Sequence, residues 1–572
     1  MASIVIQGDT SGSVTLQAPT VAGSTVINLP STSMNIGTGG GSVATNTAVG
    51  ASALANNTTG SQGVFVGAGA GAANTEANNN VAIGFRSLYS GTTTGGQNAG
   101  VGAYALYGIT TGSYNSGLGQ EVLQSNTTGS YNVAVGGNAL NANTTASSNT
   151  AVGYQAGYNN TTGQFNALLG YQAGYRVAGA GSIGDGSVLI GYRAGYANQG
   201  NNNVGIGNGA LTTNTTGTFN VAIGTSALEL NTTASYNTAV GYQAGYSTTT
   251  GGLNTSVGVI AFYTNTTGIE NVAVGYGALE KNTTGNYNVA HGVQALRFNT
   301  TASNNTAIGT QAAYANTTGA SNTAVGYQAG YSNTTASNNT AVGYQAGYSF
   351  STSGSTANST ALGYQALYTG GGGADVAVGY QALYASNSSG GASVGIGNSA
   401  GSNLITGYYG IYIGQSSQAG STSAIHEIVI GRNSTGKGTT TGFIDPGTGP
   451  VYQGNNSSTW SVTSDQRLKK NIVDNNIGLE KINAIQVRNF EYRLSEEINE
   501  LPQDQAIKKQ GVQLGVIAQE LQQILPECVR TESTGVMSID TDNLTWYLVN
   551  AIKEQQALIT TLTERITALE GA

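Results

Sequence analysis

A 17-residue repeat dominates this chain and limits what it can fold into. We anchored the repeat on a small or apolar residue followed by an aliphatic residue and glycine, as in Ala151-Val152-Gly153. Twenty-three such triplets run from Ala48-Val49-Gly50 to Val429-Ile430-Gly431, and sixteen of the twenty-two spacings between them equal one repeat length. A short, fixed period over so long a stretch is typical of a solenoid, in which each repeat forms one turn.

Each repeat reads approximately Asn-Thr-Ala-Val-Gly-Tyr-Gln-Ala-Gly-Tyr-x-Asn-Thr-Thr-x-Ser-x. Alternation, as in Val133-Ala134-Val135, predicts a short strand with one larger and one small face. Segments such as Asn126-Thr127-Thr128-Gly129 are typical of turns, because Asn and Gly accept left-handed backbone angles and polar side chains satisfy turn amides. We therefore expect each rung to contain a strand, a corner, a second short strand and a turn.

The repeats are nearly uncharged, and charge returns near residue 461. Residues 41–460 hold 7 basic and 9 acidic side chains, whereas residues 461–572 hold 11 and 16. A net charge of -8 without a basic run disfavours nucleic acid and anionic membranes as partners. No stretch of 18 apolar residues and no signal-like N-terminus occurs, so we expect neither membrane insertion nor export by a cleaved signal.

Cys528 is the single cysteine and no Cys/His cluster has zinc spacing, so we expect no metal and no cofactor.

The repeat also predicts the dimensions of the assembly. Parallel rungs stacked at about 4.8 Å would make a rod on the order of 110 Å long. Proline is absent between Pro30 and Pro446, as a continuous ladder of backbone donors requires. A 17-residue rung encloses a narrow core, and its Ala/Gly face allows close approach of a neighbouring copy. We therefore predict a homotrimer that packs through this small face.

The triplet and its Asn-Thr-Ala-Val-Gly context resemble the head repeats of trimeric autotransporter adhesins. That resemblance implies a parallel β-roll packed around a threefold axis, which in that family is left-handed. The family's repeat is usually shorter than the one here, so handedness and packing details stay open. The fold class that we predict is mainly β: an elongated parallel β-solenoid, followed by a small α+β domain that ends in a coiled-coil helix.

Two side-chain columns of the rod have alternative interpretations. Tyrosines that recur four residues apart, such as Tyr154 and Tyr158, predict aromatic ladders that seal the rungs or a seam between copies. The alternative is an aromatic strip for glycans. His291 is the one non-aliphatic middle residue of the triplets. It indicates either a satisfied core or near-axis histidine or, in a trimer, a ring of three histidines that holds an ion.

The C-terminal segment changes to helical patterns. Residues 517–525 carry helix spacing that Pro526 ends, whereas the strand-like reading of residues 512–519 is misleading. Farther on, Leu548, Ile552, Gln555, Ile559, Leu562, Ile566 and Leu569 alternate 4 and 3 residues apart, which predicts a coiled-coil seam. Ile and Leu in this seam favour two strands, and Gln555 interrupts it. We give the trimer indicated by the shaft priority over this conflicting signal.

Ser464 and Lys469 form a candidate catalytic pair at the start of this segment. A serine hydroxyl becomes a nucleophile when a base takes its proton, and a lysine can do so only as the neutral amine. Burial or neighbouring cations favour that form, and Arg467 and Lys470 are such cations. The alternative is structural: Ser464 caps a helix, Asp465 lies at its positive end and Lys469 is solvated.

Three motifs in order carry a second resemblance. They are the run from Ser464-Asp465-Gln466-Arg467-Leu468-Lys469 to Ile472, the segment Leu514-Gly515-Val516-Ile517-Ala518-Gln519-Glu520, and Ile552-Lys553-Glu554. Together they closely resemble the C-terminal intramolecular chaperone of phage tail fibres and endosialidase tailspikes, the self-cleaving peptidases of family S74. The resemblance implies a domain that trimerises, guides the preceding β-structure into a trimer and then cuts itself off.

The same resemblance implies roles for individual residues. By position, Ser464 corresponds to the nucleophile and Lys469 to its base, while Asp465 and Arg467 support the motif. Both the bond before Ser464 and the bond after it remain candidates for the cut. No other reaction is expected of the chain.

These observations predict a phage tail fibre in four parts. Residues 1–40 form a β segment for virion attachment, 41–431 the shaft, 432–463 a distal tip or linker, and 464–572 the chaperone peptidase. We expect synthesis in the host cytoplasm, location in the virion tail fibre, attachment to the phage tail or baseplate through the N-terminus, and binding to a host receptor, with glycans as one candidate class.

Two alternatives belong to other classes. A bacterial trimeric adhesin would need an export signal and a membrane-anchoring barrel, and we recognise neither in the sequence. A tailspike that degrades polysaccharide would need paired carboxylates, whereas those of the shaft are scattered singly.

Overall fold

The computed structural model describes residues 36–37, 43–90, 94–176, 182–350, 358–370, 373–387, 392–446, 451–453, 461–462, 466–500, 507, 509–531 and 535–571. Contacts between residues divide the chain into two units, Met1–Thr463 and Ser464–Ala572. Most of the predicted β segment at residues 1–40 and part of the predicted tip at residues 432–463 lie outside the described residues.

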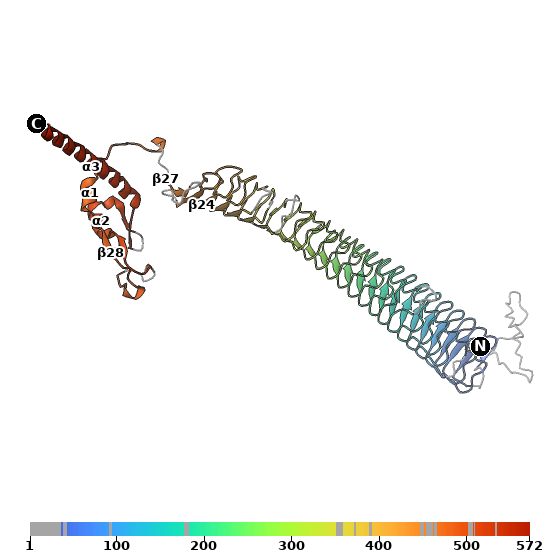
Figure 1. Ribbon diagram of the computed structural model, residues 1–572. Helices are drawn as coiled ribbons and strands as arrows, with labels where there is room; N and C mark the ends of the chain where they lie inside the picture. Colours follow the sequence, from blue (N-terminus) through green and yellow to red (C-terminus); the bar gives the residue numbers. More distant parts are fainter. Residues whose placement is uncertain are drawn as a thin grey trace, which may run out of the picture. The chain divides into compact units, whose positions relative to one another are not determined.

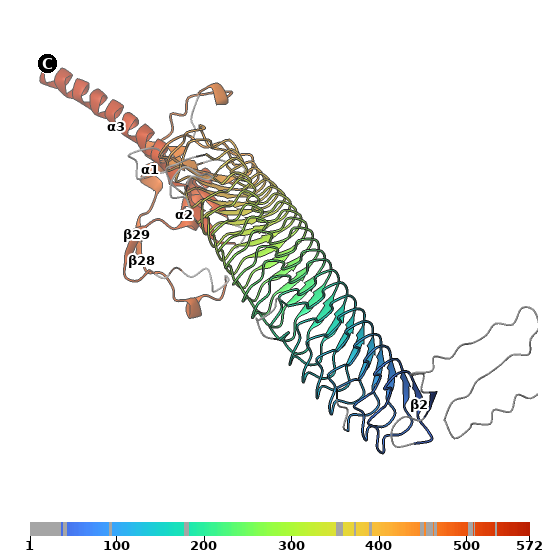
Figure 2. The same cartoon turned by 90° about the vertical axis from the view of Figure 1, so that its right-hand side faces the viewer.

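The first unit is a parallel β-solenoid in which each rung contributes one short strand to a single sheet (Figures 1 and 2). Neighbouring strands pair parallel and in register, as Thr150, Ala151 and Val152 pair with Ala167, Leu168 and Leu169. The prediction of a mainly β fold with a long parallel solenoid is confirmed. The strands are β2 (Thr47–Val49), β3 (Val64–Val66), β4 (Val81–Ile83), β5 (Ala99–Val101), β6 (Ser116–Leu118), β7 (Val133–Val135), β8 (Thr150–Val152), β9 (Ala167–Leu169), β10 (Val188–Ile190), β11 (Val204–Ile206), β12 (Val221–Ile223), β13 (Thr238–Val240), β14 (Thr255–Val257), β15 (Val272–Val274), β16 (Val289–His291), β17 (Thr306–Ile308), β18 (Thr323–Val325), β19 (Thr340–Val342), β20 (Thr360–Leu362), β21 (Val376–Val378), β22 (Val394–Ile396), β23 (Ile411–Ile413) and β24 (Ile428–Gly431).

The second strand that we expected in each rung does not form among the described residues. After β8, Gly153 has a φ of 135°, and Gln155 and Gly157 have left-handed φ values of 56° and 63°. These left-handed residues curl the chain into successive turns, so it cannot extend into a strand. Its backbone still joins the rungs, because the N–H of Gly157 donates to the carbonyl of Ala173 at 2.9 Å.

The small face of each strand is the interior of the solenoid. Ala151, at the centre of β8, is fully buried, whereas Leu169 on the outer face of β9 is 47% exposed and Ile223 on β12 is 38% exposed. The expectation that the Ala/Gly face meets a neighbouring copy is therefore wrong. Leucines from the turns that follow the strands, such as Leu140 and Leu228, are also fully buried and fill the rest of the interior.

Two columns of buried asparagines line the interior beside the alanines. One column precedes the strands: Asn149 Oδ1 accepts the backbone N–H of Asn166 at 3.0 Å, and Asn149 Nδ2 donates to the Gly163 carbonyl at 2.9 Å. The other belongs to the Asn-Thr-Thr turns, where Asn143 Nδ2 donates to Asn126 Oδ1 at 2.9 Å. The predicted turn chemistry is present, with the asparagine amides inside and joining successive rungs.

The predicted tyrosine ladders are confirmed on the outside of the shaft. Tyr171 stacks on Tyr192 with ring centroids 5.4 Å apart, and Tyr331 stacks on Tyr348 at 5.0 Å. His291 lies on the outer face of β16, where its side chain is exposed. Its interpretation as a core histidine is therefore wrong.

The ends of the stack depart from the repeat. β1 (Ile36–Gly37) pairs antiparallel with β2. At the other end β25 (Gly442–Asp445) continues the parallel stack, and β26 (Val451–Gln453) and β27 (Ser461–Val462) follow in antiparallel order. Inside the last rungs, the hydroxyl of Tyr412 donates to the buried carboxylate of Glu427 at 3.3 Å. The pKa of Tyr412 is raised mainly by burial of its side chain and further by the neighbouring carboxylate.

The second unit is a small α+β domain. Its helices are η2 (Gln466–Leu468), α1 (Leu479–Ala484), η3 (Ser495–Glu497), α2 (Ala518–Ile524), η5 (Pro526–Cys528) and α3 (Thr541–Glu570), and its strands are β28 (Arg488–Phe490), β29 (Gln513–Gly515), β30 (Val529–Thr531) and β31 (Met537–Ile539). β28 pairs antiparallel with β29, and β30 with β31. Leu521, Leu525 and Cys528 form its buried core, against which Ile539, Leu544 and other side chains pack.

Candidate functional site in the second unit

The candidate catalytic pair is only partly within the described residues. Ser464 and Asp465 lie outside them. Arg467 lies in η2, and the N–H of Lys469 donates to the carbonyl of Gln466 at 3.0 Å directly after this turn. The side chains of Arg467 and Lys469 are both exposed. A buried lysine amine is therefore not a property of the single chain.

The segment that follows the motif is held against α3. Asn550 Nδ2 donates to the carbonyl of Asn475 at 2.7 Å and to that of Ile477 at 3.3 Å. Glu554, one helical turn farther along α3, accepts the N–H of Leu479 at 3.0 Å, where α1 begins. Gly478 fits between these contacts because an added Cβ would lie 2.2 Å from the N atom of Ala551. The end of the motif region is thus fixed to the centre of the long helix.

The second motif combines a strand and a helix. Residues 513–515 form β29, so the strand-like pattern that we set aside is real for these three residues. α2 begins at Ala518 and ends at Ile524, before Pro526, as the helix spacing predicted. Glu520 on α2 pairs with Arg488 on β28, with 3.0 Å between Oε1 of Glu520 and Nη2 of Arg488. This ion pair joins the helix to the small sheet on an exposed surface.

One further interaction perturbs titratable groups beside α3. The Tyr547 hydroxyl donates to the Glu527 carboxylate, which lowers the pKa of Glu527 and raises that of Tyr547. Burial raises the pKa of the Cys528 thiol, so this thiol is not activated as a nucleophile. The contact between Tyr547 and Glu527 packs η5 on α3.

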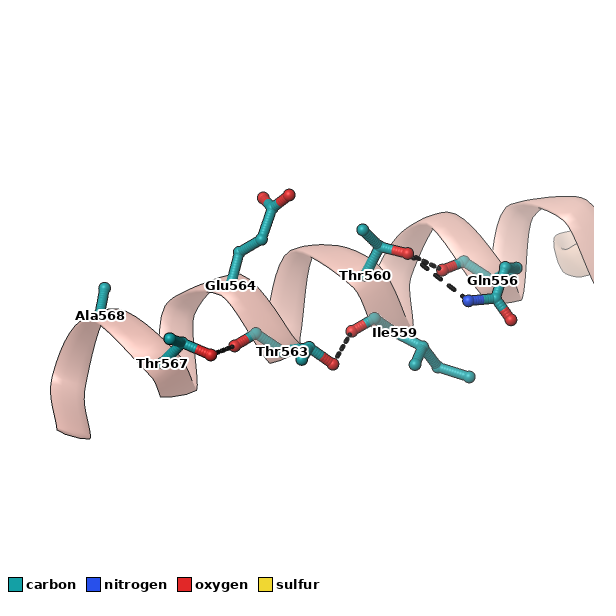
Figure 3. A pocket seen from close by; sticks show the side chains of 7 residues that line it. All are labelled: Gln556, Ile559, Thr560, Thr563, Glu564, Thr567 and Ala568. Atoms are coloured by element: carbon teal, nitrogen blue, oxygen red, sulfur yellow. Dashed lines mark hydrogen bonds between the residues drawn. The ribbon is translucent and has the colours of Figure 1, made fainter. Parts of the chain in front are cut away.

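α3 exposes most of its length in the single chain. Ile552 is 64% exposed, Leu562 55% and Leu569 79%, so the predicted seam is solvated. An open groove between Gln556 and Ala568 is lined by seven residues of this one helix (Figure 3). Its threonine hydroxyls donate to carbonyls one turn earlier, as Thr563 does to Ile559 at 2.8 Å. The groove is the side of an exposed helix, because all of its lining residues belong to α3.

The described residues contain no group of three or more His, Cys, Asp and Glu side chains that could hold a metal ion. None of the helices in the described part of the chain is both long and apolar enough to cross a bilayer.

Comparison with known families identifies the class of the second unit. Residues 464–530 match the family model Peptidase S74, described as a chaperone of endosialidase, in agreement with the resemblance of the motifs. In the sequence, a chaperone domain of this family thus follows a long β-solenoid shaft, and this order fits a phage tail fibre or tailspike. No curated protein matches the chain.

Sequence reasoning missed Asn550 and Glu554. The sequence contains a weak signal for them, because the two residues lie four apart on one face of α3 and flank the seam residue Ile552. Their partners are 73 to 75 residues away in the sequence, between positions 475 and 479. A single sequence does not reveal such pairing.

Proposed function

We propose that this protein is a phage tail fibre whose C-terminal unit aligns three copies of the chain and then releases itself by self-cleavage at Ser464. The observation that carries the proposal is the chaperone-family match directly behind a shaft of near-identical rungs. In the same proposal residues 1–40 attach the fibre to the phage tail or baseplate, and the fibre binds a host surface receptor.

The need for alignment follows from the regularity of the shaft. Successive strands present nearly the same three residues, as β18 and β19 both read Thr-Ala-Val. Copies shifted by one rung would therefore bury almost the same side chains as copies in register. A terminal domain that associates first fixes the register of the copies. After its release the shaft no longer has a route to refold, so its stability is set by a slow rate of unfolding.

The exposed surface of the second unit supports association. Its buried apolar core is small, while Leu468, Ile472, Val473 and the seam of α3 are more than half exposed at most positions. Exposed apolar patches of this kind are typical of interfaces rather than of stable monomers. Heptad seams in particular bury their apolar positions against other helices.

The proposed chemistry needs an assembled unit. The Ser464 hydroxyl attacks the carbonyl carbon of the adjoining peptide bond while the neutral amine of Lys469 takes its proton. That proton passes to the departing amide nitrogen, and water then hydrolyses the ester. Lys469 is exposed in the single chain, so burial of its amine would come from a neighbouring copy.

The test compares Ser464→Ala, Lys469→Ala and the control Lys509→Ala, which changes an exposed lysine outside the three motifs, in the full chain. We expect both dyad variants to stay at 57.6 kDa on a denaturing gel and to sediment as trimers, while the control releases its C-terminal fragment. Mass spectrometry of that fragment identifies the bond that is cut. Release of the fragment from Ser464→Ala would refute the assigned nucleophile, and monomeric chains would refute the assembly.

A further inference from the structure

The outer face of the shaft sheet, which we call the strand face, is aliphatic at most positions, with threonine or serine as the first residue of nine of its strands. It comprises the first and third residues of each strand from β2 to β24, which point outward while the central residue is buried, as in β9 and β12. Leu118, Leu169, Ile308 and Leu362 on this face are 42–53% exposed. The only ionisable side chain among these positions is His291. Soluble proteins rarely leave so long an apolar surface uncovered.

Aromatic columns border the strand face on both sides. Tyr171 follows β9 by two residues and is 43% exposed, and Phe165 precedes it by two residues and is 65% exposed. Both rings are therefore exposed close to the ends of the strand. Stacked tyrosines such as Tyr327 and Tyr344 have nearly parallel planes 5.3 Å apart between centroids, so they cover each other's faces. A sugar stacks on an open ring face, and the ladders offer few of these.

We infer that the strand face is where copies of this chain pack against one another. The inference rests on the proposed self-assembly and adds which surface performs it. The period of the surface identifies the occupant: ridges repeat at every rung, and only a partner with the same repeat matches them along the whole shaft. A charged partner would leave its charges unpaired against this surface.

The area of the strand face is sufficient for a stable interface. Twenty-two rung spacings of about 4.8 Å and a strand about 10 Å wide give on the order of 1,000 Å² for each copy. Stable interfaces bury roughly 800 Å² on each partner. The alanine interior is already fully buried within one chain, as Ala222 and Ala239 show, so it offers no competing surface.

Cysteine cross-linking in the full-length chain tests the inference. Ile223→Cys introduces a thiol at an exposed position of the strand face, and Thr216→Cys introduces one in the exposed turn that precedes the same strand. Native Cys528 is buried and common to both variants. Under mild oxidation we expect disulfide-linked chains from Ile223→Cys and none from Thr216→Cys, with trimers in sedimentation under reducing conditions.

The outcomes separate the interface from the assembly itself. One contrary outcome is a trimer that cross-links only through Thr216→Cys. Another is a trimer that cross-links neither through Ile223→Cys nor through Val240→Cys, one rung along. Either would show that the strand face is not the interface, while the proposed trimer would stand. Monomeric wild-type chains would overturn both. The variant Ile206→Glu/Ile223→Glu gives an independent measurement: we expect its shaft to dissociate at a lower temperature than that of Thr216→Glu, and equal temperatures would count against the inference.

Discussion

The carboxylate of Asp375 accepts the backbone N–H of Ser393 at 2.7 Å, one rung farther along the shaft. Asp375 occupies the interior column in which Asn149 and most other rungs have asparagine. Its side chain is fully buried, and its Oδ2 has no hydrogen-bond partner among the described residues. Burial raises the pKa of Asp375 from 3.8 to about 7.

This pKa makes the stability of the shaft fall as pH rises. Below about pH 4 the carboxyl group is protonated in both the folded and the unfolded chain, and burial has no charge penalty. Between about pH 4 and pH 7 only the unfolded chain loses the proton, so the free energy of unfolding decreases. Above pH 7 the full penalty applies. It is at most on the order of 4 kcal/mol, at about 1.4 kcal/mol for each pKa unit.

We therefore expect Asp375→Asn to stabilise the shaft at pH 8 and to have little effect at pH 4. Thermal unfolding of both proteins across this pH range measures the difference. Asp185→Asn is the matched control, because Asp185 is exposed and its removal should give no pH-dependent gain. A gain from Asp375→Asn that is as large at pH 4 as at pH 8 would contradict the buried charge.

The period of the repeat predicted the solenoid, because regular spacing requires that equivalent residues stack. The alternation of Thr150, Ala151 and Val152 identified two faces but not which one lies inside. That choice depends on which side of the strand the rest of the rung closes over, and the turn residue Leu140 packs in one buried cluster with Ala151. The burial of Asn143 was likewise hidden, since asparagine in a turn is usually solvated.

The candidate site was less predictable from local pattern than the shaft. The motif around Ser464 predicted the chaperone family that residues 464–530 match. Arg467 and Lys469 are exposed in the single chain, so their roles stay predictions. The contacts that anchor the motif region, such as Glu554 with Leu479, join residues 75 apart. Such pairing depends on tertiary structure.

A second prediction concerns the asparagine ladder inside the shaft. Asn220 Oδ1 accepts the N–H of Asn237 at 3.0 Å, and its Nδ2 donates to the carbonyl of Ala234 at 2.8 Å. Asn220→Ala would leave the buried N–H of Asn237 without its acceptor, at about 1–3 kcal/mol, and would leave the Ala234 carbonyl with Asn231 Nδ2 as its remaining donor. We expect the free energy of unfolding to fall by about 1–3 kcal/mol in chemical denaturation. Thr233→Ala, at an exposed turn residue, should change it by less than about 0.5 kcal/mol; equal losses would argue against the ladder.

The glycine at the corner after each strand supports a third prediction. Gly153 has a φ of 135°, and a Cβ there would lie 2.4 Å from the carbonyl oxygen of Gly170 in the next rung. Both the backbone angle and the contact exclude a larger residue, so Gly153→Ala should cost about 3 kcal/mol or more. Gly137→Ala is the control, because its Cβ would be 3.6 Å from the Tyr154 ring. Similar melting temperatures for the two variants would show that the corner adapts.

The last prediction concerns the anchor between α3 and the motif region. Glu554 accepts the N–H of Leu479 at the beginning of α1, a position where loss of an acceptor costs about 1 kcal/mol. Glu554→Ala should therefore weaken hydrogen-exchange protection across α1 about fivefold. Glu554→Gln keeps an oxygen acceptor and should therefore keep most of the hydrogen-exchange protection of α1. If Glu554→Gln lost as much protection as Glu554→Ala, the role of Glu554 as an acceptor would be wrong. Glu564→Ala, at an exposed residue farther along α3, should leave the protection of α1 unchanged because Glu564 is about three turns away from this contact.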